Sequence, residues 1–358
     1  MLDGTIKSDS LFNLQQEIGA ANSIGQLRAV DARVPEMVRI AMHSGAETKN
    51  VVQLISRFND AVTLRLIALL ESSEGIYLPD GATFLVLGSE GRGEQTLRTD
   101  QDNAIVYNDD LPSEDLVTVK RFATRLVDAL EEIGVPRCPG NIMASNPAWC
   151  HSVSEWKMLL ARWITVPTPE HILNIGMFQD LRALRGDEMP VIQLRDFICT
   201  EVQCHAAFFF PNMALNVVRF PSPFTILGNI RVEQDGKHNG LVDLKKAGIF
   251  AITTGSSLLA LEADIISGDT WNKLGLLGKL GGFSSGDLDA IVKAFTFLVH
   301  LRLEQQLREL SADIKPTNYV DPLQMSDNKQ EQFRHALKGV NTFLWIFRDH
   351  YQLDFNSV

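Results

Sequence analysis

Apolar residues recur at helical spacing through the first part of the chain. The pattern runs over residues 27–41, with Pro35 as a break, and again over residues 51–66. This period is typical of amphipathic helices whose apolar stripe faces a core. Turn-forming residues at 72–75 and 79–81 then interrupt it. Residues 9–75 are therefore predicted to be mostly helical, and residues 1–78 to be an N-terminal helical segment.

Short apolar runs follow this segment. Residues 83–87 (Thr-Phe-Leu-Val-Leu) lead into a glycine, and residues 104–107 (Ala-Ile-Val-Tyr) form a second run. Runs of this length are typical of buried strands. Residues 172–178 are a third candidate strand, while residues 113–132 and 154–164 have helical periodicity. The pattern predicts a small α/β core over residues 79–190.

Helical periodicity dominates from residue 191 to residue 358. The clearest helical pieces are residues 195–209, 258–266, 288–310 and 329–350. Residues 225–241 differ, because they alternate around a turn signal and so predict a hairpin. The predicted fold class is α+β, with the small α/β core flanked by the N-terminal helices and by a helical C-terminal domain.

The charge balance narrows the range of partners. Lys and Arg number 33 against 44 Asp and Glu, which gives a net charge of −11. A protein built to grip nucleic acid needs a basic face, so nucleic acid is not an expected partner. The four cysteines show no CxxC spacing and are interpreted as reduced thiols. Without a signal peptide or a long apolar run, the protein is expected to be cytoplasmic and to lack a membrane span.

Residues 86–107, VLGSEGRGEQTLRTDQDNAIVY, carry the candidate chemistry. Gly88 permits a tight turn that a phosphate can approach, and the Ser89 hydroxyl and nearby backbone N–H groups can hold phosphate oxygens. Arg92 adds a positively charged fork that suits a triphosphate. Glu94 either orients Arg92 through a hydrogen bond or lies on a solvated helix face. The glycine pattern is neither GxGxxG nor the Walker form, which disfavours dinucleotide and P-loop sites.

Paired carboxylates follow the glycine-rich turn. Asp100 and Asp102 lie two residues apart, so both side chains point to the same face of an extended segment. Such a pair suits Mg²⁺, and two ions about 3.5–4 Å apart would clamp the attacking and leaving oxygens of a displacement. Asp180, after the third candidate strand, is the expected base and third metal-binding carboxylate. The alternative for Asp180 is an ion pair with Arg182 or Arg185.

The combination of strand, Gly-Ser, fixed gap, DxD and strand resembles the polymerase-β-like nucleotidyltransferase superfamily. Within it, LGSEGRGEQTLRTDQDNAIVY is similar to a bacterial nucleotidyltransferase family whose members commonly follow cyclic-nucleotide-binding and CBS domains. That family is related to the PII uridylyltransferase and the glutamine-synthetase adenylyltransferase. The likeness covers most of residues 20–350, with further landmarks at residues 56–60, 138–147, 178–182, 241–245 and 301–306.

The resemblance implies an enzyme that transfers UMP or AMP from a nucleoside triphosphate to a hydroxyl acceptor, expected to be on a protein. It implies that Gly88 and Ser89 hold the triphosphate, and that Asp100, Asp102 and Asp180 are the catalytic and metal-binding carboxylates. The expected cofactor is Mg²⁺, with Mn²⁺ as an alternative, in a two-metal mechanism. Residues 191–358 correspond to the substrate-binding domain of the family.

Two features depart from the expected pattern. Gln101 and Asn103 are polar where the broader superfamily prefers apolar residues, and residues 253–257 lack an arginine expected in relatives. No CBS or cyclic-nucleotide-binding domain precedes the core, so regulation by a partner in trans and assembly into a homo-oligomer are alternatives that the sequence leaves open. A weakly catalytic nucleotide-sensing protein of signal transduction, and transfer to a small-molecule hydroxyl, are the alternative functions.

Overall fold

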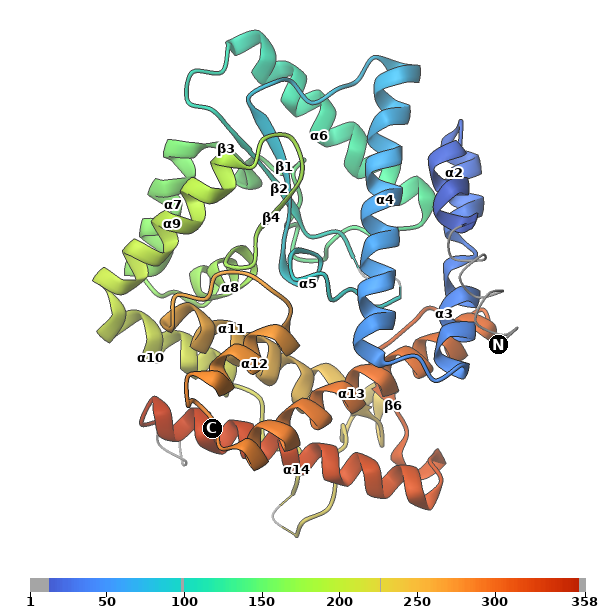
Figure 1. Ribbon diagram of the computed structural model, residues 1–358, viewed down its shortest axis with the longest axis vertical. Helices are drawn as coiled ribbons and strands as arrows, with labels where there is room; N and C mark the ends of the chain where they lie inside the picture. Colours follow the sequence, from blue (N-terminus) through green and yellow to red (C-terminus); the bar gives the residue numbers. More distant parts are fainter. Residues whose placement is uncertain (1–12, 98–99, 226, 354–358) are drawn as a thin grey trace. The chain divides into compact units, whose positions relative to one another are not determined.

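The computed structural model describes residues 13–97, 100–225 and 227–353 (Figure 1). The predicted helix over residues 9–12 therefore lies outside the described residues. Contacts within the chain define two compact units. Unit 1 comprises Met1–Leu160 and Met177–Ile198, and unit 2 comprises Ala161–Gly176 and Cys199–Val358. The architecture is α+β, as the sequence predicts.

Unit 1 holds a four-stranded sheet and the N-terminal helices. Its elements are α2 (Ile24–Asp31), α3 (Val34–His43), α4 (Thr48–Glu74), β1 (Ala82–Val86), α5 (Gly88–Gly91), β2 (Asn103–Tyr107), α6 (Ser113–Ile133), β3 (Cys150–Ser152) and β4 (Arg182–Arg185). Helices α7 (Val153–Thr165), α8 (Pro169–Phe178) and α9 (Met189–Cys204) each have residues in both units. The strands predicted at 83–87 and 104–107 correspond to β1 and β2.

The sheet has the strand order β3-β2-β1-β4. β1 runs antiparallel to both β2 and β4, whereas β3 runs parallel to β2. In the β1–β2 pair, Val86 lies opposite Asn103, and the Leu87 N–H donates to the Asp102 carbonyl at 2.9 Å just beyond it. This register brings the residue after β1 and the residue before β2 to the same edge of the sheet.

The core of unit 1 lies around β1, all of whose residues are buried. The Phe84 ring meets the Phe122 ring of α6 edge-on, with centroids 6.4 Å apart. On β2, the Ile105 carbonyl accepts a hydrogen bond of 2.9 Å from the Trp156 indole of α7. The long helix α4 packs against α6 and β4 (Figure 1). Large aromatic side chains therefore anchor α6 and α7 to the sheet that carries the candidate motif.

The strand predicted at residues 172–178 is wrong, because these residues form the end of helix α8. The Thr168 hydroxyl accepts a hydrogen bond from the His171 N–H and so caps the helix start, with Pro169 as its first residue. Ile175 and Phe178 are fully buried and lie three positions apart, which is helical spacing. A short apolar run does not distinguish a strand from a buried helix. The other two strands of the sheet are β3 and β4, which lie on the outer sides of the predicted strands β2 and β1.

Unit 2 is mainly helical. Its elements are α10 (Ala206–Val217), β5 (Val242–Asp243), a π-helical turn at Lys245–Ile249, α11 (Phe250–Glu262), α12 (Thr270–Lys279), α13 (Ser285–Ser311), β6 (Tyr319–Val320) and α14 (Asp327–His350). β5 and β6 form a two-stranded antiparallel sheet. Helices α13 and α14 pack so closely that a Cβ on Gly339 would lie 2.6 Å from the Ala290 carbonyl oxygen.

Two details of unit 2 differ from the sequence predictions. The helix predicted at 195–209 is interrupted at His205, where α9 ends and α10 follows. At 225–241 the Glu233 N–H donates to the Leu241 carbonyl, so the chain reverses as predicted, but the described residues there form no regular strands. Where the structure describes the chain, none of the helices has the length and hydropathy needed to cross a membrane.

Candidate functional site

Gly88 forms a sharp bend at the end of β1. Its φ is +52°, in the left-handed region that favours glycine. A Cβ at this position would lie 2.6 Å from the Met177 Cε and 3.6 Å from the Asp102 Oδ2. The bend therefore requires glycine, and its bare Cα faces the carboxylate of Asp102.

Helix α5 begins directly at this bend. The Glu90 and Gly91 N–H groups donate to the Leu87 carbonyl at 3.0 and 2.9 Å. Among the described residues, no group accepts a hydrogen bond from the N–H of Gly88 or Ser89. Backbone N–H groups at such a turn can bind an anion. Gly88 and Ser89 thus present the kind of donors that the sequence analysis assigned to them.

Gly91 holds α5 against the segment that carries Asp180. A Cβ on Gly91 would lie 2.0 Å from the Asp180 carbonyl oxygen, which is a backbone atom with little freedom to move. Even alanine is therefore excluded at Gly91 unless the backbone shifts. The short helix and the turn before β4 are packed backbone to backbone, although they are far apart in the sequence.

Asp100 and Asp102 lie together, as their spacing predicts. One carboxylate oxygen from each and the Cys138 Sγ are all within 4.8 Å of one another, and the three residues are half-buried. Asp180 does not belong to this group. Oxygen ligands on one face, partly shielded from water, are the donor set that a divalent cation prefers. The two carboxylates therefore fit the metal ion that the motif implies.

The polar residues that depart from the superfamily pattern have structural partners. Gln101 is buried, and its Nε2 donates to the carbonyls of Val127 and Val135, each at 3.2 Å. The Asn103 side-chain oxygen accepts a hydrogen bond of 2.8 Å from the Ala144 N–H. These amides point away from the carboxylate face and satisfy buried backbone groups. Their polarity therefore serves to fix the segment that carries Asp100 and Asp102.

Cys138 is the functional candidate that the sequence analysis missed, since it was interpreted only as a reduced thiol. Burial raises the pKa of the Cys138 thiol to about 11, and the Asp102 carboxylate adds to that rise by its charge and by a hydrogen bond. The backbone N–H groups of Gly140 and Ile142 act in the opposite direction. A thiol with such a pKa is protonated at neutral pH.

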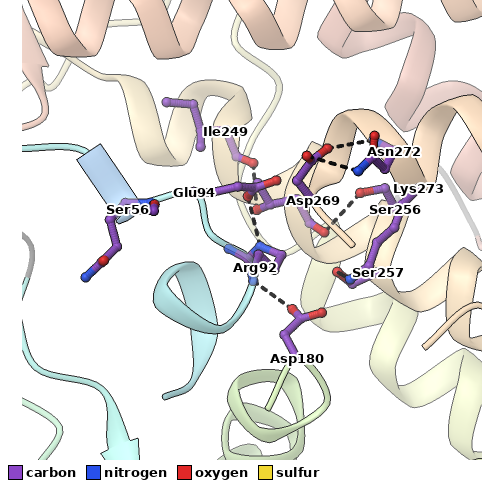
Figure 2. Close-up of polar contacts among 12 residues, drawn as sticks. Ser56, Arg92, Glu94, Asp180, Ile249, Ser256, Ser257, Asp269, Asn272 and Lys273 are labelled. Atoms are coloured by element: carbon purple, nitrogen blue, oxygen red, sulfur yellow. Dashed lines mark hydrogen bonds and ion pairs between the residues drawn. The ribbon is translucent and has the colours of Figure 1, made fainter. Parts of the chain in front are cut away.

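Arg92 lies between two carboxylates (Figure 2). Its Nη1 donates to Asp180 at 2.7 Å and its Nε to Glu94 at 2.9 Å, and all three side chains are largely buried. The predicted hydrogen bond between Glu94 and Arg92 is confirmed. Burial lowers the pKa of Arg92, but the charges and hydrogen bonds of the two acids outweigh it and raise the pKa overall.

Asp180 therefore lies in an ion pair with Arg92 rather than with the arginines that its sequence suggested. Arg182 pairs with Asp60 at 2.9 Å, and Arg185 is 3.8 Å from Glu71. An ion pair with arginine favours the charged carboxylate. The role of Asp180 as base and third metal ligand stays a prediction.

Glu90 is a second residue near the site that the sequence analysis did not single out. Burial, with added repulsion from Asp60 and Asp102, raises the pKa of its carboxyl to about 8. Glu90 also lines a cavity of about 60 Å³, together with Gln101 and Thr96. Among the described residues, the buried Gln101 Oε1 and Thr96 Oγ1 have no hydrogen-bond partner. A polar cavity of this size has room for water.

A polar cluster in unit 2 lies on helices α11 and α12 (Figure 2). The Lys273 Nζ donates to the Ser257 hydroxyl at 2.8 Å, although Lys273 is only 2 % exposed. Asp269 caps α12 by accepting a hydrogen bond of 2.7 Å from the Asn272 N–H. The serine and threonine residues of 253–257 thus have a cationic neighbour, which comes from α12 and not from their own helix.

Two family models match the chain. Residues 32–170 match the family described as "Putative nucleotidyltransferase DUF294", and residues 207–351 match "Putative nucleotidyltransferase substrate binding domain". The chain belongs to this nucleotidyltransferase family. The first match contains the Gly88 bend, the aspartate pair and Cys138, and the second contains Lys273. No curated protein matches the chain.

Proposed function

We propose that this nucleotidyltransferase transfers UMP or AMP from a nucleoside triphosphate to a hydroxyl group of a protein, with the help of two divalent metal ions. One observation carries the proposal: the Cα of Gly88 faces Asp102 so closely that a Cβ would lie 3.6 Å from Oδ2. The turn proposed to bind phosphate and the carboxylates proposed to bind metal therefore lie side by side at one edge of the sheet. Nucleotidyl transfer requires these two parts side by side.

The chain's own groups would position the triphosphate. The N–H groups of Gly88 and Ser89 would donate to phosphate oxygens. Arg92 binds its two carboxylates through Nε and Nη1, so Nη2 is the nitrogen that would donate to a phosphate. Asp100 and Asp102 would hold Mg²⁺ or Mn²⁺, which neutralises the triphosphate and makes the acceptor hydroxyl a better nucleophile.

Asp180 is proposed as the group that takes the acceptor proton. The hydroxyl oxygen would attack the α-phosphate, the bond to the pyrophosphate would break, and the hydroxyl proton would pass to the Asp180 carboxylate. Arg92 fixes the direction of that carboxylate through their ion pair. In this proposal Arg92 connects triphosphate binding to the position of the base.

Unit 2 is proposed to bind the acceptor. The family match described as a substrate-binding domain covers residues 207–351, which lie within unit 2. The resemblance to enzymes that modify other proteins favours a protein acceptor over a small molecule.

Transfer of a label tests the proposal. The purified protein is incubated with α-phosphate-labelled nucleoside triphosphates, Mg²⁺ or Mn²⁺ and host lysate. We expect label on a protein, and at least about 100-fold less label with the double variant Asp100→Asn/Asp102→Asn. The matched control Asp80→Asn/Asp110→Asn removes two exposed carboxylates, one before β1 and one after β2, and should keep activity.

Each other outcome of this experiment has a definite meaning. Absence of labelled product with the wild type, or equal labelling by the Asp100→Asn/Asp102→Asn variant, would overturn the proposal. Nucleotide binding in calorimetry without any transfer would point instead to a nucleotide-sensing protein. Label that appears only on small molecules would retain the transfer reaction and refute the protein acceptor.

A further inference from the structure

The segment that carries the two aspartates is paired with the loop that carries Cys138. The Gln101 N–H donates to the Pro136 carbonyl at 3.0 Å, and the Asn103 N–H donates to the Ile142 carbonyl at 3.2 Å. These two hydrogen bonds lie on either side of Asp102 in the sequence. They hold residues 136–142 beside the aspartates at two points, so the position of Cys138 is fixed from both ends of its loop.

The loop itself turns at the cysteine. The Asn141 N–H donates to the Cys138 carbonyl at 2.9 Å, and Asn141 has a φ of +54°, which asparagine tolerates better than most residues. The Asn146 side chain donates to the Asn141 carbonyl at 2.9 Å and secures the turn. A Cβ on Gly140 would lie 3.6 Å from the Cys138 Sγ, in ordinary contact. The sulfur is therefore held by a hydrogen-bonded turn and lies close to the two carboxylates.

We propose that Cys138 is a protein ligand, beside Asp100 and Asp102, of the divalent metal ion bound there, and that its sulfur makes the site prefer Co²⁺ or Zn²⁺ over Mg²⁺. The inference rests on the proposed function, because it takes the two aspartates as metal ligands. The three donor atoms lie within 4.8 Å of one another, so one ion can contact all of them after small side-chain movements. On binding, the S–H bond breaks, the sulfur donates an electron pair to the ion, and the proton passes to water.

The choice of metal follows from the donor set. Mg²⁺ prefers oxygen ligands and an octahedral shell with several waters, so a thiolate contributes little to its binding. Borderline divalent ions accept both carboxylate oxygen and thiolate sulfur. The sulfur of Cys138 therefore strengthens the binding of borderline ions more than that of Mg²⁺. The two aspartates alone would not produce this preference.

Titration with Co²⁺ alone tests the proposal on the full chain, without nucleotide or acceptor. A sulfur-bound Co²⁺ gives a thiolate-to-metal charge-transfer absorption band. We expect this band in the wild type and in the matched control Cys150→Ser, which removes another part-buried cysteine. We expect it to be lost in Cys138→Ser and in Asp102→Asn.

Affinities separate a ligand from a merely structural residue. In calorimetry, Cys138→Ser should weaken Co²⁺ binding by about 10-fold or more, while its Mg²⁺ affinity changes by less than about 2-fold. The variant Cys138→Asp supplies a third oxygen ligand and should shift the preference toward Mg²⁺, which keeps the proposal testable if Cys138→Ser folds poorly.

Three results would overturn the assignment of Cys138. They are no band in the wild type, a band that persists in Cys138→Ser, or an equal loss of Co²⁺ and Mg²⁺ affinity in that variant. The outcome is independent of the transfer assay. A protein that shows the band but transfers no nucleotide would support the ligand and refute the enzymatic proposal, and the reverse result would do the opposite.

Discussion

Replacement of Gly88 by alanine tests the proposed phosphate-binding turn, and Gly93 offers a matched control. Both glycines have a left-handed backbone, with φ of +52° at Gly88 and +67° at Gly93. An alanine in this conformation costs roughly 1–2 kcal/mol. We therefore expect Gly88→Ala and Gly93→Ala to lower the free energy of unfolding by similar amounts in urea denaturation.

The surroundings of the two glycines differ. A Cβ on Gly93 would meet no atom within 4 Å, whereas a Cβ on Gly88 would lie 2.6 Å from the Met177 Cε and 3.6 Å from the Asp102 Oδ2. The methionine end is flexible and can move aside. The new methyl group, however, would stand where a phosphate must approach the Gly88 N–H and the metal ligands.

The expected loss of affinity follows from one hydrogen bond. A hydrogen bond to a charged group contributes about 1.5–3 kcal/mol, so its loss weakens binding by about 10- to 150-fold. Calorimetric titration with a non-hydrolysable triphosphate and Mg²⁺ should show this loss in Gly88→Ala and nearly unchanged affinity in Gly93→Ala. Equal affinities of the two variants would refute the placement of the phosphates at Gly88.

Three further variants test the charged groups. Arg92→Lys loses the fork that binds two acids, so the free energy of unfolding in urea should fall by about 1–3 kcal/mol, and an unchanged midpoint would contradict this. The Glu90 carboxyl has a folded pKa of about 8 against an ordinary 4.5, so wild-type stability should fall as the pH rises between these values. Glu90→Gln should lack this fall in urea midpoints taken across that range, and an identical pH profile would exclude Glu90 as its source. The hydrogen bond that His350 donates to Glu262 raises the pKa of His350 above 6.5, so the pair should stabilise the fold below pH 6.5 and lose its effect as the pH rises through the folded pKa. His350→Gln should lower the free energy of unfolding by less than about 1 kcal/mol below pH 6.5, because the pair is partly exposed, and should leave it unchanged at alkaline pH. Equal losses at both pH values would contradict this prediction.

The local parts of the site were predictable from the sequence. Two apolar runs, a glycine between them and two aspartates at alternate positions determine β1, the bend and the shared carboxylate face. These features depend on backbone geometry within about 20 residues. The antiparallel register of β1 and β2 then brings Gly88 and Asp102 together.

The remaining parts depend on contacts between distant segments. Arg92 and Asp180 are 88 positions apart, and their ion pair exists because Gly91 packs against the Asp180 backbone. Cys138 lies beside the aspartates because its loop is hydrogen-bonded to the backbone of Gln101 and Asn103. No periodicity or spacing encodes such pairings. The third predicted strand failed for a related reason, since a short apolar run is compatible with both a strand and a buried helix.

A crystal structure with Mn²⁺ and a non-hydrolysable nucleoside triphosphate tests the central claim most directly. Mn²⁺ is located by its anomalous scattering. The account predicts an ion bound by carboxylate oxygens of both Asp100 and Asp102, with the triphosphate lying against the N–H groups of Gly88 and Ser89. An ion bound elsewhere, or a triphosphate away from the Gly88 bend, would contradict it.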